Sequence, residues 1–123
     1  MSLRCDQAPA WAALREHHAR VGHAFDVRAA FQSDLQRVQH FGLQAPHVYA
    51  DLSKNRIDAA ANALLTALAE QCDLPAQRDA MFAGEAVNVT EQRAALHTLL
   101  RVPAGAASQV PAHLQARLAQ VHT

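Results

Sequence analysis

The chain repeats its apolar residues with the period of an α-helix from one end to the other, and this restricts its fold more than any other feature. One helix face is outlined near the start by residues three or four apart: Trp11, Leu14, His18, Val21 and Phe25. Asp26 is a candidate N-cap for the next helix. That helix is outlined by Val27, Phe31, Leu35 and Val38.

Further helices are expected after each of several start signals. Ser53 precedes a helix that runs through Leu68, and Pro75 precedes one that ends near Phe82 and Gly84. Asn88 and Glu91, in capping-box spacing, precede a helix that ends near Arg101. Pro111 precedes a last helix. Residues 102–110 are uncharged and rich in small side chains, which predicts an internal linker.

Only one clear strand signal interrupts this pattern. Residues 47–51 alternate and include valine and tyrosine. A lone strand needs a partner, which residues 41–45 supply as a hairpin arm unless the partner lies outside the chain. We therefore expect a mainly α fold of five or six helices with one short strand or hairpin. The 123 residues suffice for one domain, and their 28 alanines predict helix contacts between small side chains.

Charge and composition exclude several classes of protein. Eleven basic and eleven acidic residues balance, which argues against binding of nucleic acid or anionic lipid through bulk charge. No apolar run reaches the length of a membrane span, and the first residues show no secretory signal. Cys5 and Cys72 have no framework spacing, which is typical of a reduced, cytoplasmic chain.

The motifs of common catalytic and metal sites are missing. Eight histidines are present, but no HExxH motif or Cys/His cluster, and His17 and His18 are adjacent and so point to different helix faces. GxSxG, Walker A and GxGxxG motifs are absent as well. We therefore expect no metal site.

Two stretches concentrate charged and capping residues. Residues 51–56 join the end of a strand to a helix start, where α/β enzymes often assemble sites. The alternative, which the spacing alone favours, is a capped helix start with solvated charges. Residues 84–97 contain Arg93 and His97, which one helical turn would present together to an anion. The alternative there is a polar helix stripe that meets water.

These stretches resemble the glucose-6-phosphate isomerase (phosphoglucose isomerase) family. Its Asp-Tyr-Ser-Lys-Asn segment is matched by Asp51-Leu52-Ser53-Lys54-Asn55. Its Met-Phe-x-Gly-Glu-x-Ile-Asn-x-Thr-Glu-x-Arg-Ala-Val-Leu-His segment is matched from Met81 to His97. Trp11, Leu14 and His17 fit an opening pattern of the family, so the resemblance covers about residues 9–101. Departures are Leu52 for tyrosine, Ala86 for lysine and Val102 for asparagine.

The resemblance implies the N-terminal part of a larger α/β enzyme of the three-layer sugar-isomerase type, spanning residues 1–123 as a single helical segment. The whole enzyme would be a cytoplasmic homodimer that acts on a sugar phosphate in glycolysis and gluconeogenesis. Its catalytic residues would lie beyond this segment, which would then be inactive alone. The alternative is a free-standing helical interaction module derived from an isomerase gene.

For individual residues, the resemblance implies that Arg93 and His97 lie near the wall of the substrate site. The other matched motif positions are Asp51, Ser53, Lys54, Asn55, Gly84, Glu85, Asn88, Thr90 and Glu91. No catalytic residue is carried over, and the resemblance implies no metal and no organic cofactor.

Overall fold

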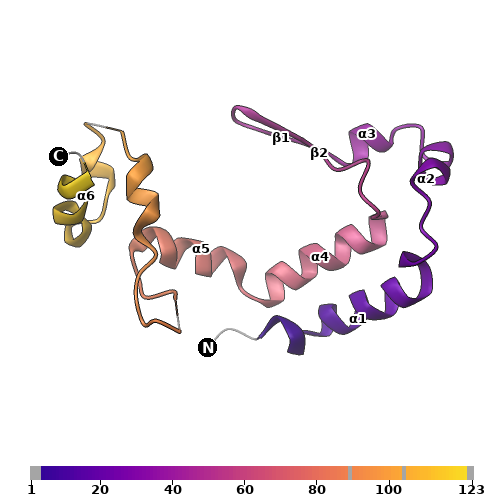
Figure 1. The fold of residues 1–123 in the computed structure, drawn as a ribbon, viewed down its shortest axis with the longest axis horizontal. Coiled ribbons are helices and arrows are strands. Elements are labelled where there is room, and N and C mark those ends of the chain that lie inside the picture. The colour runs from indigo at the N-terminus through magenta and orange to yellow at the C-terminus, as the bar shows by residue number, and fades with distance from the viewer. Residues whose placement is uncertain (1–3, 89, 104, 122–123) are drawn as a thin grey trace. The chain divides into compact units, whose positions relative to one another are not determined.

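A computed structural model describes residues 4–88, 90–103 and 105–121, and this part of the chain is mainly helical with one antiparallel hairpin (Figure 1). The chain divides into two compact units, Met1–Cys72 (unit 1) and Asp73–Thr123 (unit 2). The predicted fold class is confirmed.

Unit 1 contains four helices labelled in Figure 1 and the hairpin. In chain order they are α1 (Pro9–His17), α2 (Val27–Ser33), α3 (Arg37–His40), β1 (Gly42–Ala45), β2 (Val48–Asp51) and α4 (Ala59–Gln71). Short turns accompany them, a 3-10 turn over Cys5–Gln7 and a π-helical turn over His18–Gly22 that extends α1.

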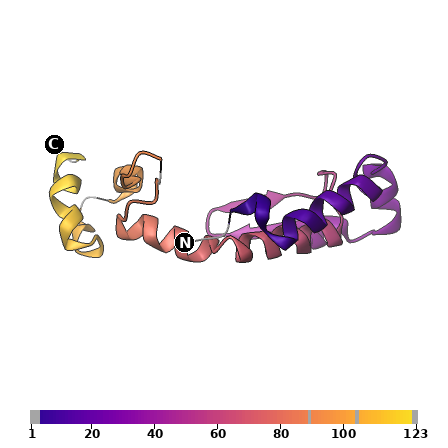
Figure 2. The same ribbon diagram turned by 90° about the horizontal axis from the view of Figure 1, so that it is seen from below.

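Helices α1 and α4 lie side by side and antiparallel in both views (Figures 1 and 2). At the start of α1, Ala8 and Ala10 are almost fully buried. The Ala10 N–H, which lacks a partner within the first turn of α1, donates to Gln71 Oε1 at 2.9 Å.

The helix predicted from Val27 through Val38 is broken in two. Asp26 caps α2 as expected, accepting from the Arg28 N–H at 2.7 Å. At Asp34, however, the backbone is extended and the side chain accepts from the Gln36 N–H at 3.0 Å. An aspartate that bonds its own neighbouring backbone competes with helical hydrogen bonds, so α2 ends at Ser33 and α3 begins at Arg37.

The hairpin follows the predicted arms. β1 and β2 pair antiparallel, with Gly42 opposite Asp51 and Ala45 opposite Val48. His47 takes a positive φ of 63° in the turn, which is uncommon for a residue with a side chain. Leu52 adds one further hydrogen bond, from its N–H to the Phe41 carbonyl at 3.0 Å.

Ser53 does not cap a helix, contrary to the sequence prediction. Helix α4 begins at Ala59, and its N-cap is Asp58, which accepts from the Ala61 N–H at 2.7 Å. Residues 52–58 form a loop because the carbonyls of Ser53, Asn55 and Ile57 accept hydrogen bonds from Arg37.

Unit 2 consists of α5 (Leu74–Ala83), α6 (Gln115–Val121) and 3-10 turns over Leu96–Arg101, Ala107–Gln109 and Ala112–Leu114. Gly84 ends α5 as predicted, with a positive φ of 75°. Its N–H bonds the Met81 carbonyl and the Glu85 N–H bonds the Ala80 carbonyl, which is the Schellman pattern. The core of the unit is a cluster formed by Leu99, Val110, Leu114 and Leu118.

The helix predicted from Asn88 to Arg101 is wrong over its first half. Asn88 Oδ1 does accept from the Glu91 N–H, as a cap would, at 3.2 Å. Gln92 then takes a positive φ of 51°, and Arg93 pairs with Asn88 as an isolated antiparallel bridge. Among the described residues of this stretch, only Leu96–Arg101 are helical, in 3-10 form.

Candidate functional site

The first motif stretch forms the loop that leaves β2. Asp51 accepts from the Ser53 N–H at 2.8 Å, and its carboxylate lies 3.7 Å from Lys54 Nζ. The Lys54 side chain is 80% exposed, so its ammonium is presented to solvent. Arg56 ties the loop to the end of the π-helical turn by donating to the carbonyls of Gly22 and His23.

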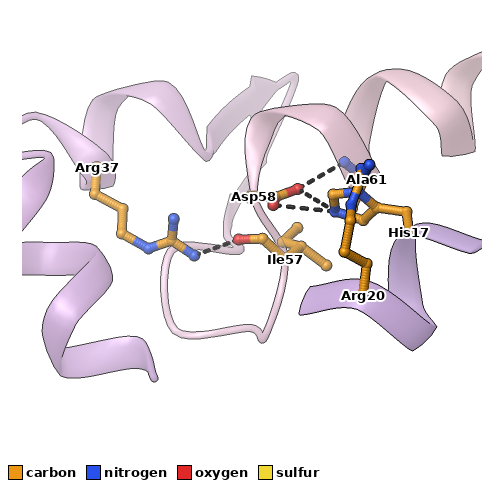
Figure 3. A network of polar contacts seen from close by, with 6 residues as sticks. All are labelled: His17, Arg20, Arg37, Ile57, Asp58 and Ala61. Atoms are coloured by element: carbon orange, nitrogen blue, oxygen red, sulfur yellow. Dashed lines mark hydrogen bonds and ion pairs between the residues drawn. The ribbon is translucent and has the colours of Figure 1, made fainter. Parts of the chain in front are cut away.

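A buried arginine fixes the backbone of this loop. Arg37 in α3 is only 3% exposed. Its guanidinium donates to the carbonyls of Ser53 at 2.7 Å, Asn55 at 3.1 Å and Ile57 at 2.7 Å, and Figure 3 shows the last of these. The planar fork of arginine suits this task, because its several donors reach alternate carbonyls of one loop.

Aromatic rings surround the same guanidinium. Its central carbon lies 4.3 Å from the ring centroid of Phe41, 5.6 Å from that of Phe25 and 5.8 Å from that of Phe31. Ring faces stabilise a cation at such distances and exclude water from it. The buried charge is therefore satisfied by carbonyls and rings together, without a carboxylate in the contacts described.

A histidine–aspartate pair closes the other end of the loop (Figure 3). His17 Nε2 lies 3.0 Å from both carboxylate oxygens of Asp58, and the His17 side chain is only 12% exposed. Asp58 thus caps α4 and fastens it to α1 at the same time. Arg20 Nη2 lies 3.5 Å from the other ring nitrogen of His17.

Two carboxylates of this region are stabilised in their charged form. The Ser53 hydroxyl and N–H, together with the Lys54 ammonium, lower the pKa of Asp51. The Ser53 hydroxyl is buried and lies near Asp51, but it makes no hydrogen bond of good geometry with the described residues. Partial burial acts to raise the pKa of Asp58, but the Ala61 N–H and His17 outweigh it, so that pKa is lowered.

The second motif stretch, in unit 2, is an exposed turn. Glu91 and Arg93 form an ion pair with side chains 51% and 71% exposed. Asn88 organises the turn by accepting from the Thr90 hydroxyl at 2.8 Å as well as from the Glu91 N–H.

Arg93 and His97 do not share a helix face, contrary to the expectation from their spacing. Arg93 lies in the bridge to Asn88, whereas His97 lies in the 3-10 turn that follows and is exposed. Glu85 lies at the Schellman cap beside Gly84.

A pocket of about 360 Å³ lies beside the unit 2 core. Its wall is apolar apart from a few polar groups and includes Phe82, Leu99, Arg101, Val110 and Pro111. A smaller pocket of about 180 Å³ in unit 1 is lined by His17, His18, Arg56 and Asp58 among apolar neighbours. Neither pocket is lined by Arg93, His97 or Lys54.

Over the described ranges, no group of three or more His, Cys, Asp or Glu side chains is arranged to hold a metal ion. The same ranges contain no helix long and apolar enough to cross a bilayer.

Sequence reasoning missed two residues of this region, Arg37 and Asp58. Asp58 precedes the apolar, alanine-rich run 59–71, which is a recognisable N-cap signature. Arg37 has no such signal, because its acceptors lie 16 to 20 residues away along the chain.

Comparison with known families defines the class of protein to which these motifs belong. The model of the phosphoglucose isomerase family matches residues 51–121, a range that contains both motif stretches. The chain belongs to this family.

Individual relatives carry one name throughout. Glucose-6-phosphate isomerase of Polaromonas naphthalenivorans is 62% identical over 104 residues, which are 85% of this chain and 20% of the relative. The enzyme of that name from Leptothrix cholodnii is 58% identical, over 85% of this chain and 19% of the relative. The one from Albidiferax ferrireducens is 51% identical, over 98% of this chain and 24% of the relative. The chain thus spans about a fifth of the length of these relatives.

Proposed function

We propose that this chain is the N-terminal part of a glucose-6-phosphate isomerase, which interconverts glucose 6-phosphate and fructose 6-phosphate. The observation that carries the proposal is the identity of up to 62% to relatives of that name, over most of the chain. The family match across residues 51–121 supports it independently of any one relative. As part of the same proposal, the enzyme acts in glycolysis and gluconeogenesis, in the cytoplasm.

In this proposal the chain is a scaffold, and the reacting groups come from elsewhere in the enzyme. The family reaction opens the sugar ring and moves a proton between C2 and C1 through an enediol. A carboxylate base suits that step because the proton is α to a carbonyl. The His17–Asp58 pair does not supply the base, since the Asp58 carboxylate is already engaged by the Ala61 N–H and by His17.

The motif positions are assigned supporting roles. Asp51, Ser53, Lys54 and Asn55 shape the loop that Arg37 holds, while Gly84, Glu85, Asn88, Thr90 and Glu91 shape the turn of unit 2. We assign Arg93 and His97 to the outer wall of the substrate site. Their exposure supports this, because solvent-facing polar groups are available to contact a further part of the enzyme. The whole enzyme is proposed to act as a homodimer on a sugar phosphate, without metal, organic cofactor, nucleic acid or membrane.

A segment exchange tests the proposal. The matching N-terminal region of the Polaromonas naphthalenivorans isomerase is replaced by this chain, and conversion of fructose 6-phosphate is measured. A soluble, folded chimera that retains turnover supports the assignment. A chimera that is folded but inactive contradicts it, and the same exchange carrying Arg37→Met reports whether the loop of unit 1 is needed.

The scaffold role has its own test. The purified 123-residue chain is incubated with glucose 6-phosphate, and we expect no turnover above the uncatalysed rate. Turnover near that of an intact relative would contradict the assignment of the reacting groups to another part of the enzyme. The reading frame downstream of residue 123 separates an enzyme from a free-standing interaction module: continuation into a phosphate-binding segment supports the former.

A further inference from the structure

The two cysteines of the chain meet at one end of the α1–α4 pair. Cys5 lies in the 3-10 turn before α1, and Cys72 is the C-cap of α4, 67 residues further along the chain. Their sulfur atoms are 3.0 Å apart, and both residues are free thiols. Sequence spacing alone gave no reason to pair them.

Neighbouring contacts hold the two thiols together independently of the sulfur contact. The buried residues Ala8 and Ala10 lie just after Cys5, and the Ala10 N–H donates to Gln71, the residue before Cys72. The start of α1 is therefore anchored to the end of α4 within one residue of the thiol on that side. At the other end of the same helix pair, His17 and Asp58 provide a second anchor.

We propose that Cys5 and Cys72 form a site of reversible oxidation, at which a peroxide or an oxidised low-molecular-weight disulfide converts the two thiols to an intramolecular disulfide. The bond would join residues 5 and 72 and so pin the start of unit 1 to the end of α4. It would lie outside both motif stretches.

The chemistry balances with hydrogen peroxide as the oxidant. The sulfur of Cys5 attacks the peroxide, forming a sulfenic acid and releasing one water. The sulfur of Cys72 then attacks that sulfenic sulfur, the S–S bond forms, and the hydroxyl leaves as a second water with the proton of the Cys72 thiol. Two thiols lose two electrons in total and the peroxide gains them. With an oxidised low-molecular-weight disulfide, two thiol–disulfide exchanges give the same product and two reduced thiols.

The surroundings of the two thiols suggest which one reacts first. Cys5 is exposed and accessible to an oxidant, whereas Cys72 is half-buried. The hydrogen bond between them raises the pKa of the Cys72 thiol, which keeps that sulfur protonated and slow to react until its partner is oxidised. Cys5 is therefore the attacking thiol and Cys72 the resolving one.

The test is oxidation of the full, reduced chain with hydrogen peroxide. We expect the monomer to lose the mass of two hydrogen atoms and both reactive thiols, and a protease digest to show residues 5 and 72 in one cross-linked peptide. A reductant should reverse the change. In a buffer that keeps the chain folded, the disulfide should form about tenfold faster than in concentrated urea, because the fold raises the effective concentration of one thiol at the other. The cross-linked chain should melt roughly 10 °C higher than the reduced chain.

Cys5→Ser and Cys72→Ser are the matched controls, and each should give no intramolecular bond. The proposal is overturned if the unsubstituted chain forms dimers through disulfides between two molecules. It is also overturned if both thiols of that chain stay reactive. Equal rates of disulfide formation in native buffer and in urea would overturn the proposal too, because the fold would then contribute nothing to the pairing of the two cysteines.

Discussion

The two stretches that carry the family motifs are held by different kinds of interaction. In unit 1, the loop after β2 depends on Arg37, a buried residue from another element that binds three of the loop's carbonyls. In unit 2, the turn around Asn88 is closed by its own neighbours, through a local bridge, a side-chain cap and an exposed ion pair.

A substitution distant in the sequence should therefore affect the loop of unit 1 more than the turn of unit 2. Loss of Arg37 leaves three carbonyls without their charged donor and removes a cation from an aromatic cage. No single residue outside the unit 2 turn has a comparable role in the contacts described. The stability of unit 2 comes instead from its leucine-rich cluster.

The largest effect is expected for Arg37→Met. It should destabilise unit 1 by about 3–5 kcal/mol, because hydrogen bonds to a charged group are lost and buried acceptors stay unsatisfied. Urea unfolding of the full chain measures the loss. Arg28→Met, at an exposed arginine nine residues earlier, is the control, and an equal effect of the two substitutions would show that burial of Arg37 carries no special weight.

Leu118→Ala tests the other side of the comparison. Leu118 is 3% exposed in the cluster of unit 2, and its truncation should destabilise that unit by about 2–4 kcal/mol through lost burial and a cavity. Leu100→Ala removes a leucine that is 69% exposed and should change stability by less than about 0.5 kcal/mol. Similar losses in the two variants, measured by urea unfolding, would contradict the assignment of the core.

Asp58→Ala should have an intermediate effect of about 1 kcal/mol from the lost N-cap. Its pH dependence is more specific. The pKa of Asp58 is lowered by folding, so its contribution is present above the unfolded pKa of 3.8 and is lost as pH falls through the folded value. The urea midpoint of the parent chain should therefore fall more steeply in acid than that of Asp58→Ala. Asp26→Ala, which removes an N-cap at the start of α2, is the matched control.

The smallest effect is expected for Lys54→Arg. This side chain is 80% exposed and its one ion pair, at 3.7 Å from Asp51, is weak, so stability should change by less than about 0.5 kcal/mol. Ten of the eleven cations in the chain are arginine, so a lysine here suggests a requirement for lysine in the assembled enzyme. Kinetics of the chimera with Lys54→Arg test this, and unchanged turnover and KM would mean that the lysine has no special role.

Local signals predicted much of this fold. Asp26 and Gly84 mark helix ends that the structure shows, and the alternation in residues 47–51 located the hairpin. Each of these features depends on a residue and its close neighbours, which a single sequence records directly.

The errors at the two motif stretches have different physical causes, a contact distant in sequence in unit 1 and a local turn in unit 2. Ser53 has the chemistry of an N-cap, but Arg37 takes the carbonyls of the loop and moves the helix start to Asp58. Asn88 and Glu91 do form a cap-like hydrogen bond, but the positive φ of Gln92 turns the chain back before a helix can grow. The motif resemblance therefore located the two stretches, whereas their conformations depend on a tertiary contact in unit 1 and on a local reversal of the chain in unit 2.

Hydrogen exchange of backbone amides tests the comparison between the two loops most directly. The Asn55 N–H bonds the Leu52 carbonyl within the loop that Arg37 holds, and the Arg93 N–H bonds the Asn88 carbonyl within the turn of unit 2. In Arg37→Met, our account predicts much faster exchange at Asn55 and unchanged exchange at Arg93. Unchanged exchange at Asn55, or equal acceleration at both amides, would contradict it.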